Sequence, residues 1–302
     1  MNQKIFVRIQ KKKKELDRHR PLAKSVLERL QKQIALDWTY NSNAIEGNSL
    51  TLRETQLVLE DGVTIKGKSL REHFEAKNHE RAIQFLMQLV KEKTKLTEDI
   101  ILKLHALVLD GIEEDFAGRY RNGRVRITGA NFVPPNPLKV PDLMERLMEW
   151  VKRSLKQLNP VCFAAQLQHR FIWIHPFFDG NGRTGRLLMN LSLMQKGYPP
   201  AVILKNDRKK YYDALNQANE GDYEKLDLLV AQAIERSLDL YLEACAFSSV
   251  KEEYLLLSEL AKKTPYSQEY LSLLARRGRI DAFKISRNWY SSLSAIEGYS
   301  KE

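Results

Sequence analysis

Apolar residues recur three and four positions apart over most of the chain, as in Ala82, Phe85, Leu86, Leu89 and Val90. This period places apolar side chains on one face of an amphipathic helix. The 302 residues therefore predict a chiefly helical, all-α protein, with one large domain and a smaller one. Because no apolar run reaches the roughly 20 residues of a membrane-spanning helix and no secretory signal is evident, we expect no membrane contact and a cytoplasmic location.

Two segments depart from this helical pattern. From Gly118 to Pro141, glycines and prolines flank short β-branched stretches, which predicts a small hairpin and loop. After Phe247 the pattern changes to short helices and alternating residues. The domains that we expect are an N-terminal helical region at 1–95, a core at 96–247 and a small domain at 248–302. Within the core, we expect helices over 142–158 and 161–173, from near Gly185, and over 207–247 with a break at Gly221.

Cysteine content and charge narrow the function classes. Cys162 and Cys245 are far apart and have no His or Cys neighbour at metal-ligand spacing. They predict two buried thiols and indicate neither a disulfide framework nor a zinc site. The formal net charge of +11 favours polyanionic partners such as nucleotide phosphates, nucleic acid or acidic proteins.

The string HPFFDGNGRTGR, at residues 175–186, concentrates the chemistry. Three glycines, Gly180, Gly182 and Gly185, permit positive φ angles and close backbone approach, so successive N–H groups can cradle an anion. The helix that follows adds its positive end.

Four side chains of the string suit phosphoryl chemistry. Arg183 and Arg186 can clamp phosphate oxygens, and Asp179 can hold Mg²⁺. His175 supplies a base that works near neutral pH. A histidine beside a proline is by itself usually a loop residue, but the whole string favours in-line attack on a phosphate.

The string resembles the signature of the Fic family, His-x-Phe-x-Asp/Glu-Gly-Asn-x-Arg-x-x-Arg, at every defined position. The resemblance covers about Ala35 to Leu240. It implies a Fic-type helical bundle with a small β-hairpin flap. It also implies transfer of AMP from ATP to a Ser, Thr or Tyr hydroxyl of a target protein, with release of pyrophosphate. Gly182 stands where kinase-like members carry Lys, which favours AMP transfer.

The resemblance also assigns roles within the loop. His175 would deprotonate the target hydroxyl, and Asp179 would bind the Mg²⁺ that bridges the α- and β-phosphates. The backbone of Asn181 and Gly182, with the Asn181 side chain, would hold phosphate oxygens. Phe177 would anchor the loop in the core. The loop residues assigned to ATP binding are Phe177, Gly180, Asn181, Gly182, Arg183, Gly185 and Arg186.

Ser42, Glu46 and Gly47 form a second motif. The spacing places Ser42 and Glu46 on one helix face, with Gly47 as a left-handed cap. Without other signals this is a capped surface helix. The segment resembles the family's inhibitory motif, Ser/Thr-x-x-x-Glu-Gly/Asn, carried in a helix over about 37–47. The resemblance implies that Glu46 pairs with Arg186, blocks the γ-phosphate and lowers activity. In some relatives the glutamate also promotes removal of AMP, which would make the enzyme bifunctional.

Two further segments resemble parts of the family's active site. Tyr211, Tyr212 and Asn219 resemble the adenine-binding region, although aromatic residues at this spacing are usually core. Tyr212 and Asn219 fall on one helix face. The stretch from Arg124 to Thr128 resembles the flap that holds the target by strand pairing; its alternative is a structural hairpin.

The last 50 or so residues resemble a winged helix-turn-helix module, with Ser267 as an N-cap, Gly278 as a C-terminal cap and 285–289 as the wing. Basic residues there suit DNA phosphates: Arg276, Arg277, Arg279, Lys284 and Arg287. Such modules also dock proteins or dimerise, so DNA and protein contact stay open.

Two alternatives to the AMP-transferring enzyme stay open. The first is a DNA-binding regulator that uses the Fic fold to sense nucleotide, although a sensor does not need the base His175. The second is a Fic enzyme that transfers another phosphate-containing group. Relatives that dimerise suggest a homodimer, and the protein target is not specified by the sequence.

Overall fold

The computed structural model describes residues 3–22, 24–127, 132–249, 254–285 and 288–299. It divides into two compact units, Met1–Glu243 and Ala244–Glu302. The finer division expected at residue 95 stays a prediction.

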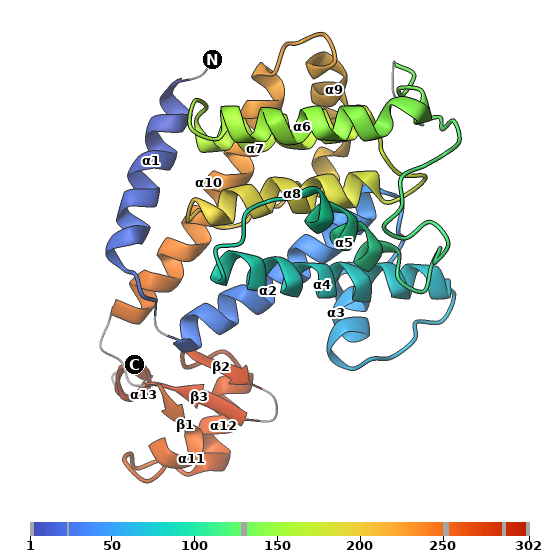
Figure 1. The fold of residues 1–302 in the computed structure, drawn as a ribbon. Coiled ribbons are helices and arrows are strands. Elements are labelled where there is room, and N and C mark those ends of the chain that lie inside the picture. Colours follow the sequence, from blue (N-terminus) through green and yellow to red (C-terminus); the bar gives the residue numbers. More distant parts are fainter. Residues whose placement is uncertain (1–2, 23, 128–131, 250–253, 286–287, 300–302) are drawn as a thin grey trace. The chain divides into compact units, whose positions relative to one another are not determined.

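The first unit is chiefly helical, as the periodicity predicts (Figure 1). Its helices are α1 (Gln3–Arg18), α2 (Lys24–Ile45), α3 (Leu52–Glu60), α4 (Leu70–Lys91), α5 (Glu98–Leu109), α6 (Val140–Ser154), α7 (Pro160–Ile174), α8 (Asn181–Gln195), α9 (Arg208–Ala218) and α10 (Glu224–Ser249), which continues past Glu243. One-turn 3₁₀ helices precede α6 and α9, at Pro137–Lys139 and Lys205–Asp207.

Helix α8 is the centre of this unit. Its apolar residues, among them Leu187, Leu188 and Leu191, have no exposed surface. A helix that is buried on every side needs neighbours all round, and α8 packs beside α7 with α2, α4 and α5 around it (Figure 1). The first turns of this central helix also bury two arginines, Arg183 and Arg186.

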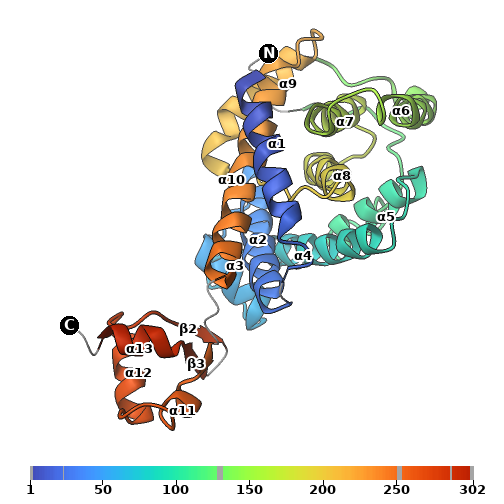
Figure 2. The ribbon, with the colours of Figure 1, turned by 90° about the vertical axis from the view of Figure 1, so that its left-hand side faces the viewer.

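The long helices α1 and α10 run side by side in both ribbon views (Figures 1 and 2). Arg8 forms two hydrogen bonds with the Glu235 carboxylate, at 2.8 and 2.9 Å, and Lys12 reaches Glu235 and Asp239. Charged contacts therefore join the start of the chain to the last helix of the unit.

The expected hairpin is not present as paired strands in the described residues 118–127 and 132–136. Thr128 and Gly129 lie outside the described residues. A buried arginine organises the segment instead. Arg121, 2% exposed, donates from Nε to the His175 carbonyl, from Nη1 to that of Gly123 and from Nη2 to that of Pro135. Three loop carbonyls thus receive hydrogen bonds from one side chain, not from a strand ladder.

The second unit contains β1 (Leu255–Leu256), α11 (Leu257–Leu260), α12 (Gln268–Arg276), β2 (Ala282–Ile285), β3 (Asn288–Ser291) and α13 (Leu293–Tyr299). The strands form an antiparallel sheet in the order β1-β3-β2, with Leu256 opposite Tyr290 and Phe283 opposite the same Tyr290. Its own small core includes Leu257, Leu260, Leu271, Leu274 and Ile296.

The ends of α12 follow the sequence pattern. Ser267 Oγ accepts the Tyr270 N–H, and Gly278 has φ 63°. The winged helix-turn-helix assignment stays a prediction, and Arg287 of the expected wing lies outside the described residues.

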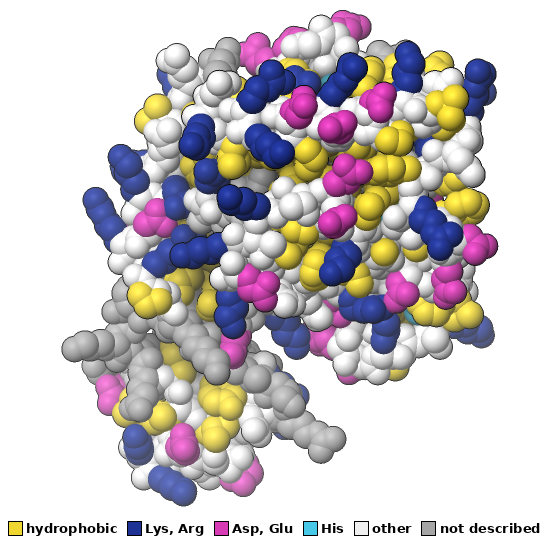
Figure 3. All heavy atoms as spheres, viewed as in Figure 1, with side chains coloured by type: hydrophobic (Ala, Val, Ile, Leu, Met, Phe, Trp, Pro, Cys, Tyr) yellow, Lys and Arg dark blue, Asp and Glu magenta, His cyan; other side chains and the backbone are white. Residues whose placement is uncertain are grey.

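The cysteines and the charged side chains are placed as the composition predicts. Cys162 and Cys245 are both buried and neither is in a disulfide. Figure 3 shows Lys and Arg spread over the face of the first unit with Asp and Glu between them. Among the described helices, none has the length and apolar run needed to cross a bilayer.

We predict that Arg121→Met lowers the free energy of unfolding by about 2 to 4 kcal/mol, because it leaves three carbonyls without their charged donor. Urea unfolding measures this change. Arg124→Met is the matched control, since Arg124 is exposed and close in the same loop. Equal stability of the two variants would contradict the role of Arg121.

Candidate active site

The loop between α7 and α8 begins with a residue in an uncommon conformation. His175 follows the end of α7 with φ 50° and ψ 59°, in the left-handed region. Residues with side chains adopt this conformation rarely, and where they do the surroundings hold them there. The His175 backbone N–H donates to the Phe171 carbonyl at 3.1 Å. The end of α7 therefore fixes the position of the His175 backbone, from which the imidazole extends.

The hydrogen-bond partner of the His175 ring shows which of its two nitrogens carries the proton. Nδ1 lies 3.2 Å from the Ile172 carbonyl oxygen, which can only accept, so Nδ1 carries the proton. Burial lowers the pKa of His175 to about 4, despite the Ile172 hydrogen bond that raises it. At neutral pH the ring is therefore uncharged, and Nε2 offers a lone pair.

Helix α8 starts at Asn181, not near Gly185 as the sequence suggested. Gly180, with φ 73°, ends the loop, and the helix begins at the next residue. The glycines inside the helix obscured its start. This start places the unpaired N–H groups of the first turn directly after the loop, where they can bind an anion.

Of the three glycines, only Gly180 has a positive φ. The other two allow close contacts. A Cβ on Gly185 would lie 3.1 Å from Cγ1 of Ile172, and one on Gly182 would lie 2.1 Å from Oε1 of Glu46. Any side chain at 182 would therefore displace the Glu46 carboxylate.

The Glu46 carboxylate occupies the arginine side of the loop. Helix α2 ends at Ile45, Glu46 follows it, and Gly47 takes φ 104°. Oε1 of Glu46 lies 2.8 Å from Nη2 of Arg186, which is 2% exposed. Burial lowers the pKa of Arg186, but Glu46 outweighs it and leaves the pKa raised.

Ser42 completes this contact. Its Oγ accepts from Nε of Arg186 at 3.0 Å, and its carbonyl accepts from Nη2 at 2.7 Å. Among the described residues, Nη1 of Arg186 has no hydrogen-bond partner. The motif at 42–47 and the second arginine of the loop thus meet, although they are far apart in the sequence.

The Asn181 side chain holds the loop itself. Its Oδ1 accepts the Phe177 N–H at 3.0 Å, and its Nδ2 donates to the Phe177 carbonyl at 2.9 Å. One N–H of this amide is not used by these bonds, so the contact between the Asn181 side chain and phosphate stays a prediction. Phe177 is fully buried and stacks on His105, with ring centroids 3.5 Å apart.

Asp179 is the acidic residue of the loop. Its Oδ1 accepts the Gly180 N–H, and its Oδ2 lies 2.5 Å from Nη2 of Arg71 and 3.2 Å from Nη2 of Arg183. Burial raises the pKa of Asp179, but Arg183, the Gly180 N–H and Arg71 outweigh it, so the pKa is lowered and the group is a carboxylate.

The Asp179 carboxylate is a candidate ligand for Mg²⁺. In the part of the chain that the structure describes, no group of three or more His, Cys, Asp or Glu could hold a metal ion. Mg²⁺ often binds through a single carboxylate and takes its other ligands from phosphates and water. Asp179 could therefore supply one carboxylate ligand to Mg²⁺.

Three supporting residues were not identified from the sequence. Arg71 pairs with Asp179, and Glu75 lies 3.3 Å from Nη1 of Arg183. His105 donates from Nε2 to the Asp179 carbonyl, while its Nδ1 accepts the Gly118 N–H. These residues sit in α4 and α5 with no motif around them, so only the fold identifies them.

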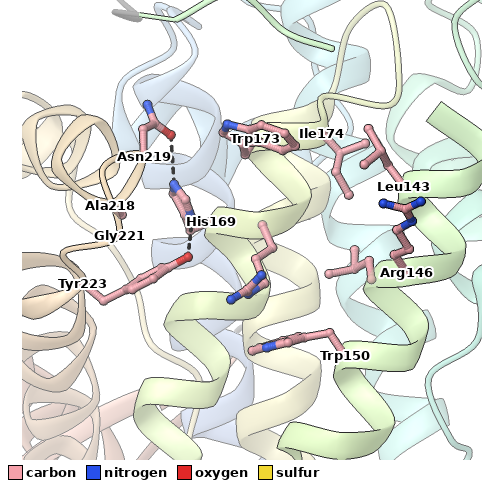
Figure 4. A pocket seen from close by; sticks show the side chains of 12 residues that line it. Leu143, Arg146, Trp150, His169, Trp173, Ile174, Ala218, Asn219, Gly221 and Tyr223 are labelled. Carbon is pink, nitrogen blue, oxygen red and sulfur yellow. Dashed lines mark hydrogen bonds between the residues drawn. The ribbon is translucent and has the colours of Figure 1, made fainter. Parts of the chain in front are cut away.

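The three residues predicted to contact the base lie in different environments. Tyr211 is fully buried, and its hydroxyl accepts from Gln168 at 2.7 Å, so it belongs to the core. Tyr212 donates to the Ile45 carbonyl at 3.3 Å, beside the Glu46 segment. Asn219 accepts a hydrogen bond from His169 and borders a cavity of about 400 Å³ (Figure 4).

Comparisons with known proteins agree with this geometry. The sequence profile of the Fic/DOC family matches residues 95–193, which include the whole loop. A curated relative from Drosophila willistoni, named protein adenylyltransferase Fic, is 40% identical over 223 residues, covering 74% of this chain and 44% of the relative. The chain thus spans less than half the length of that protein.

Solved structures match over more of their length. Fic-1 from C. elegans is 33% identical with a TM-score of 0.74, over 82% of this chain and 73% of that one. A Fic domain containing signaling protein from Bacteroides thetaiotaomicron is 31% identical with a TM-score of 0.73, over 80% of this chain and 98% of that one. Because sequence, loop and fold agree over these lengths, the chain belongs to the Fic/DOC family.

Proposed function

We propose that the protein is a protein adenylyltransferase, which transfers AMP from ATP to a Ser, Thr or Tyr hydroxyl of a target protein. One observation supports this above the others. The neutral ring of His175 and the amide-rich start of α8 belong to one short loop, with two buried arginines in the first turns of that helix. Relatives named protein adenylyltransferase Fic support the same reaction.

In this reaction the target hydroxyl oxygen attacks the α-phosphorus, and its proton passes to Nε2 of His175. The bond from the α-phosphorus to the bridging oxygen breaks, and pyrophosphate leaves. The first-turn amides of α8 and the side chains of Arg183 and Arg186 stabilise the phosphate charge. Asp179 would hold Mg²⁺, which neutralises further charge when bound.

Glu46 acts as the brake in this proposal. A carboxylate on Arg186 occupies the position that a γ-phosphate needs, and both anions compete for the same guanidinium. The wild-type chain therefore has low activity. The second role, in which Glu46 helps remove AMP from the modified target, stays a prediction.

We predict that Glu46→Gly raises transfer of label from ATP labelled at the α-phosphate by tenfold or more, because it frees Arg186. Transfer to the protein itself or to a cell extract is measured by autoradiography. Glu60→Gly is the matched control, since Glu60 also lies at a helix end but pairs with Lys32 away from the loop. Adding His175→Ala to Glu46→Gly should abolish the label.

Other outcomes distinguish the alternatives. Nucleotide binding without transfer in the Glu46→Gly variant supports a nucleotide sensor. Label from the γ-phosphate, or a preference for UTP or GTP, supports transfer of another group.

The pKa of His175 leads to a second prediction. A pKa near 4 keeps the base neutral above that pH, so activity is lost only as pH falls toward 4. We expect the transfer rate of Glu46→Gly at saturating Mg-ATP to be level from pH 6 to 8. A decline centred near the ordinary histidine value of about 6.5 would contradict the buried, neutral ring.

The second unit supplies a candidate surface for DNA or protein. Arg276, Arg277 and Arg279 are exposed at the end of α12, as is Lys284 in β2. Exposed arginines at a helix end favour phosphate contacts. Contact with an acidic protein and formation of a homodimer also stay predictions.

We predict that replacing these three arginines by Gln weakens binding of the full chain to duplex DNA about tenfold at low salt and reduces the salt dependence. Fluorescence anisotropy with labelled DNA measures both. The matched control carries Gln at the three exposed α1 lysines, Lys4, Lys11 and Lys14. Equal binding by both variants would exclude this surface as the DNA site.

A further inference from the structure

The cavity of about 400 Å³ in Figure 4 lies beside the phosphate loop and is lined chiefly by α6 and α7. Large side chains of both helices border it: Arg146 and Trp150 on α6, and Arg170, Trp173 and Ile174 on α7. Its volume is within the range of ligand pockets. The cavity therefore has room for a side chain or a short segment of another molecule.

The cavity carries positive charge without a matching acid. Among the described residues that line it, two are arginines and none is Asp or Glu. Neither Arg146 nor Arg170 has a hydrogen bond or an ion pair within the described part of the chain, and Nε of Arg170 is buried. Glu149, three residues after Arg146 on α6, does not border the cavity. Because a guanidinium donor away from water needs an acceptor, an anionic group is the complementary occupant.

Aromatic rings hold one of these arginines in place. Cζ of Arg170 lies 4.6 Å from the centre of the Trp150 ring, and Trp150 stacks on Phe163 with ring centroids 5.3 Å apart. A guanidinium stacked on an aromatic face keeps the N–H groups at its edge available for an acceptor. Burial, and to a smaller extent the charge of Arg170, lowers the pKa of His169. This lining ring is therefore neutral, and the two arginines supply the charge.

The cavity also lies close to the catalytic base. Ile174 directly precedes His175, and Arg170 stands five residues before His175, about 7.5 Å along the axis of α7. Trp173 stacks on Phe132, which belongs to the loop that leads into α6, with ring centroids 6.4 Å apart. An extended chain advances about 3.3 Å per residue. A target segment with its hydroxyl at His175 therefore reaches the arginines within about two to four residues.

We infer that this cavity binds an acidic side chain of the target protein, close to the residue that is modified. The inference rests on the proposed function and specifies its protein substrate: Asp or Glu lies about two to four residues from the modified Ser, Thr or Tyr. The carboxylate accepts hydrogen bonds from Arg170 and Arg146, and the rings of Trp150 and Trp173 cover its apolar stem. The cavity thus selects which hydroxyls are presented to His175.

The test uses the Glu46→Gly variant, ATP labelled at the α-phosphate and a set of synthetic peptides. Each peptide has Ser, Thr or Tyr at the centre of an Ala- and Gly-rich sequence, with Glu, Lys or Ala at one of the four positions on either side. We expect Glu at one or two of these positions to raise kcat/KM about five- to tenfold over Ala, as a charged hydrogen bond predicts. Lys at the same positions should lower it.

Variants of the two arginines connect this preference to the cavity. Arg146→Gln with Arg170→Gln should lower the preference for Glu below about twofold, because both donors are removed. Lys152→Gln with Arg153→Gln is the matched control, which removes two exposed charges of α6 that do not border the cavity and should keep the full preference. Arg146 is exposed, so Arg146→Glu tests the inference without a change in the core and should shift the preference from Glu to Lys.

The same measurements contain the results that would overturn the inference. These are the absence of a preference for Glu at every position, or an equal preference in the double variant and its control. A rise of more than about threefold in the KM for ATP of Arg146→Glu would assign the cavity to the nucleotide instead. Label on proteins of a cell extract without any preference among the peptides refutes the inference alone. No label on either refutes the proposed function, and the inference falls with it.

Discussion

The ion pair between Glu46 and Arg186 is the interaction on which the rest of the site depends. A buried guanidinium needs an anion, since an unpaired charge away from water is costly. Arg186 is 2% exposed and has Glu46 at 2.8 Å. Under the proposed function, a nucleotide can use this arginine only by replacing the carboxylate with its own phosphate. Gly182 makes the contact sterically feasible, because a Cβ there would collide with Glu46.

Around this pair, side chains that donate to backbone carbonyls hold the loop at residues 175–180. Arg121 donates to the His175 carbonyl, and His105 donates to that of Asp179. Burial lowers the pKa of His105, His169 and His175 alike, so the three rings are neutral and their partners decide which nitrogen carries the proton. Hydrogen bonds of these neutral histidines thus help to hold the 175–186 loop, fix the ring of His175 and connect His169 to Asn219.

The sequence predicted the parts that depend on local pattern. Helical periodicity indicated the fold, and the loop and the Ser42–Gly47 motif indicated the two segments that meet at Arg186. The geometry of individual side chains could be predicted less well from the sequence. The start of α8 at Asn181, the Asn181 bonds to Phe177 and the burial of Tyr211 depend on tertiary packing. The segment around Arg121 was expected to be a hairpin because its composition is typical of one, yet a single arginine replaces the strand pairing in its described residues.

A crystal structure of the Glu46→Gly variant with Mg²⁺ and a non-hydrolysable ATP analogue tests the central claim most directly. The account predicts a terminal phosphate on Arg186 in the place that the carboxylate leaves, with the α-phosphate beside the first turn of α8 and near His175. A nucleotide bound elsewhere, with Arg186 paired to another side chain of the protein, would contradict it.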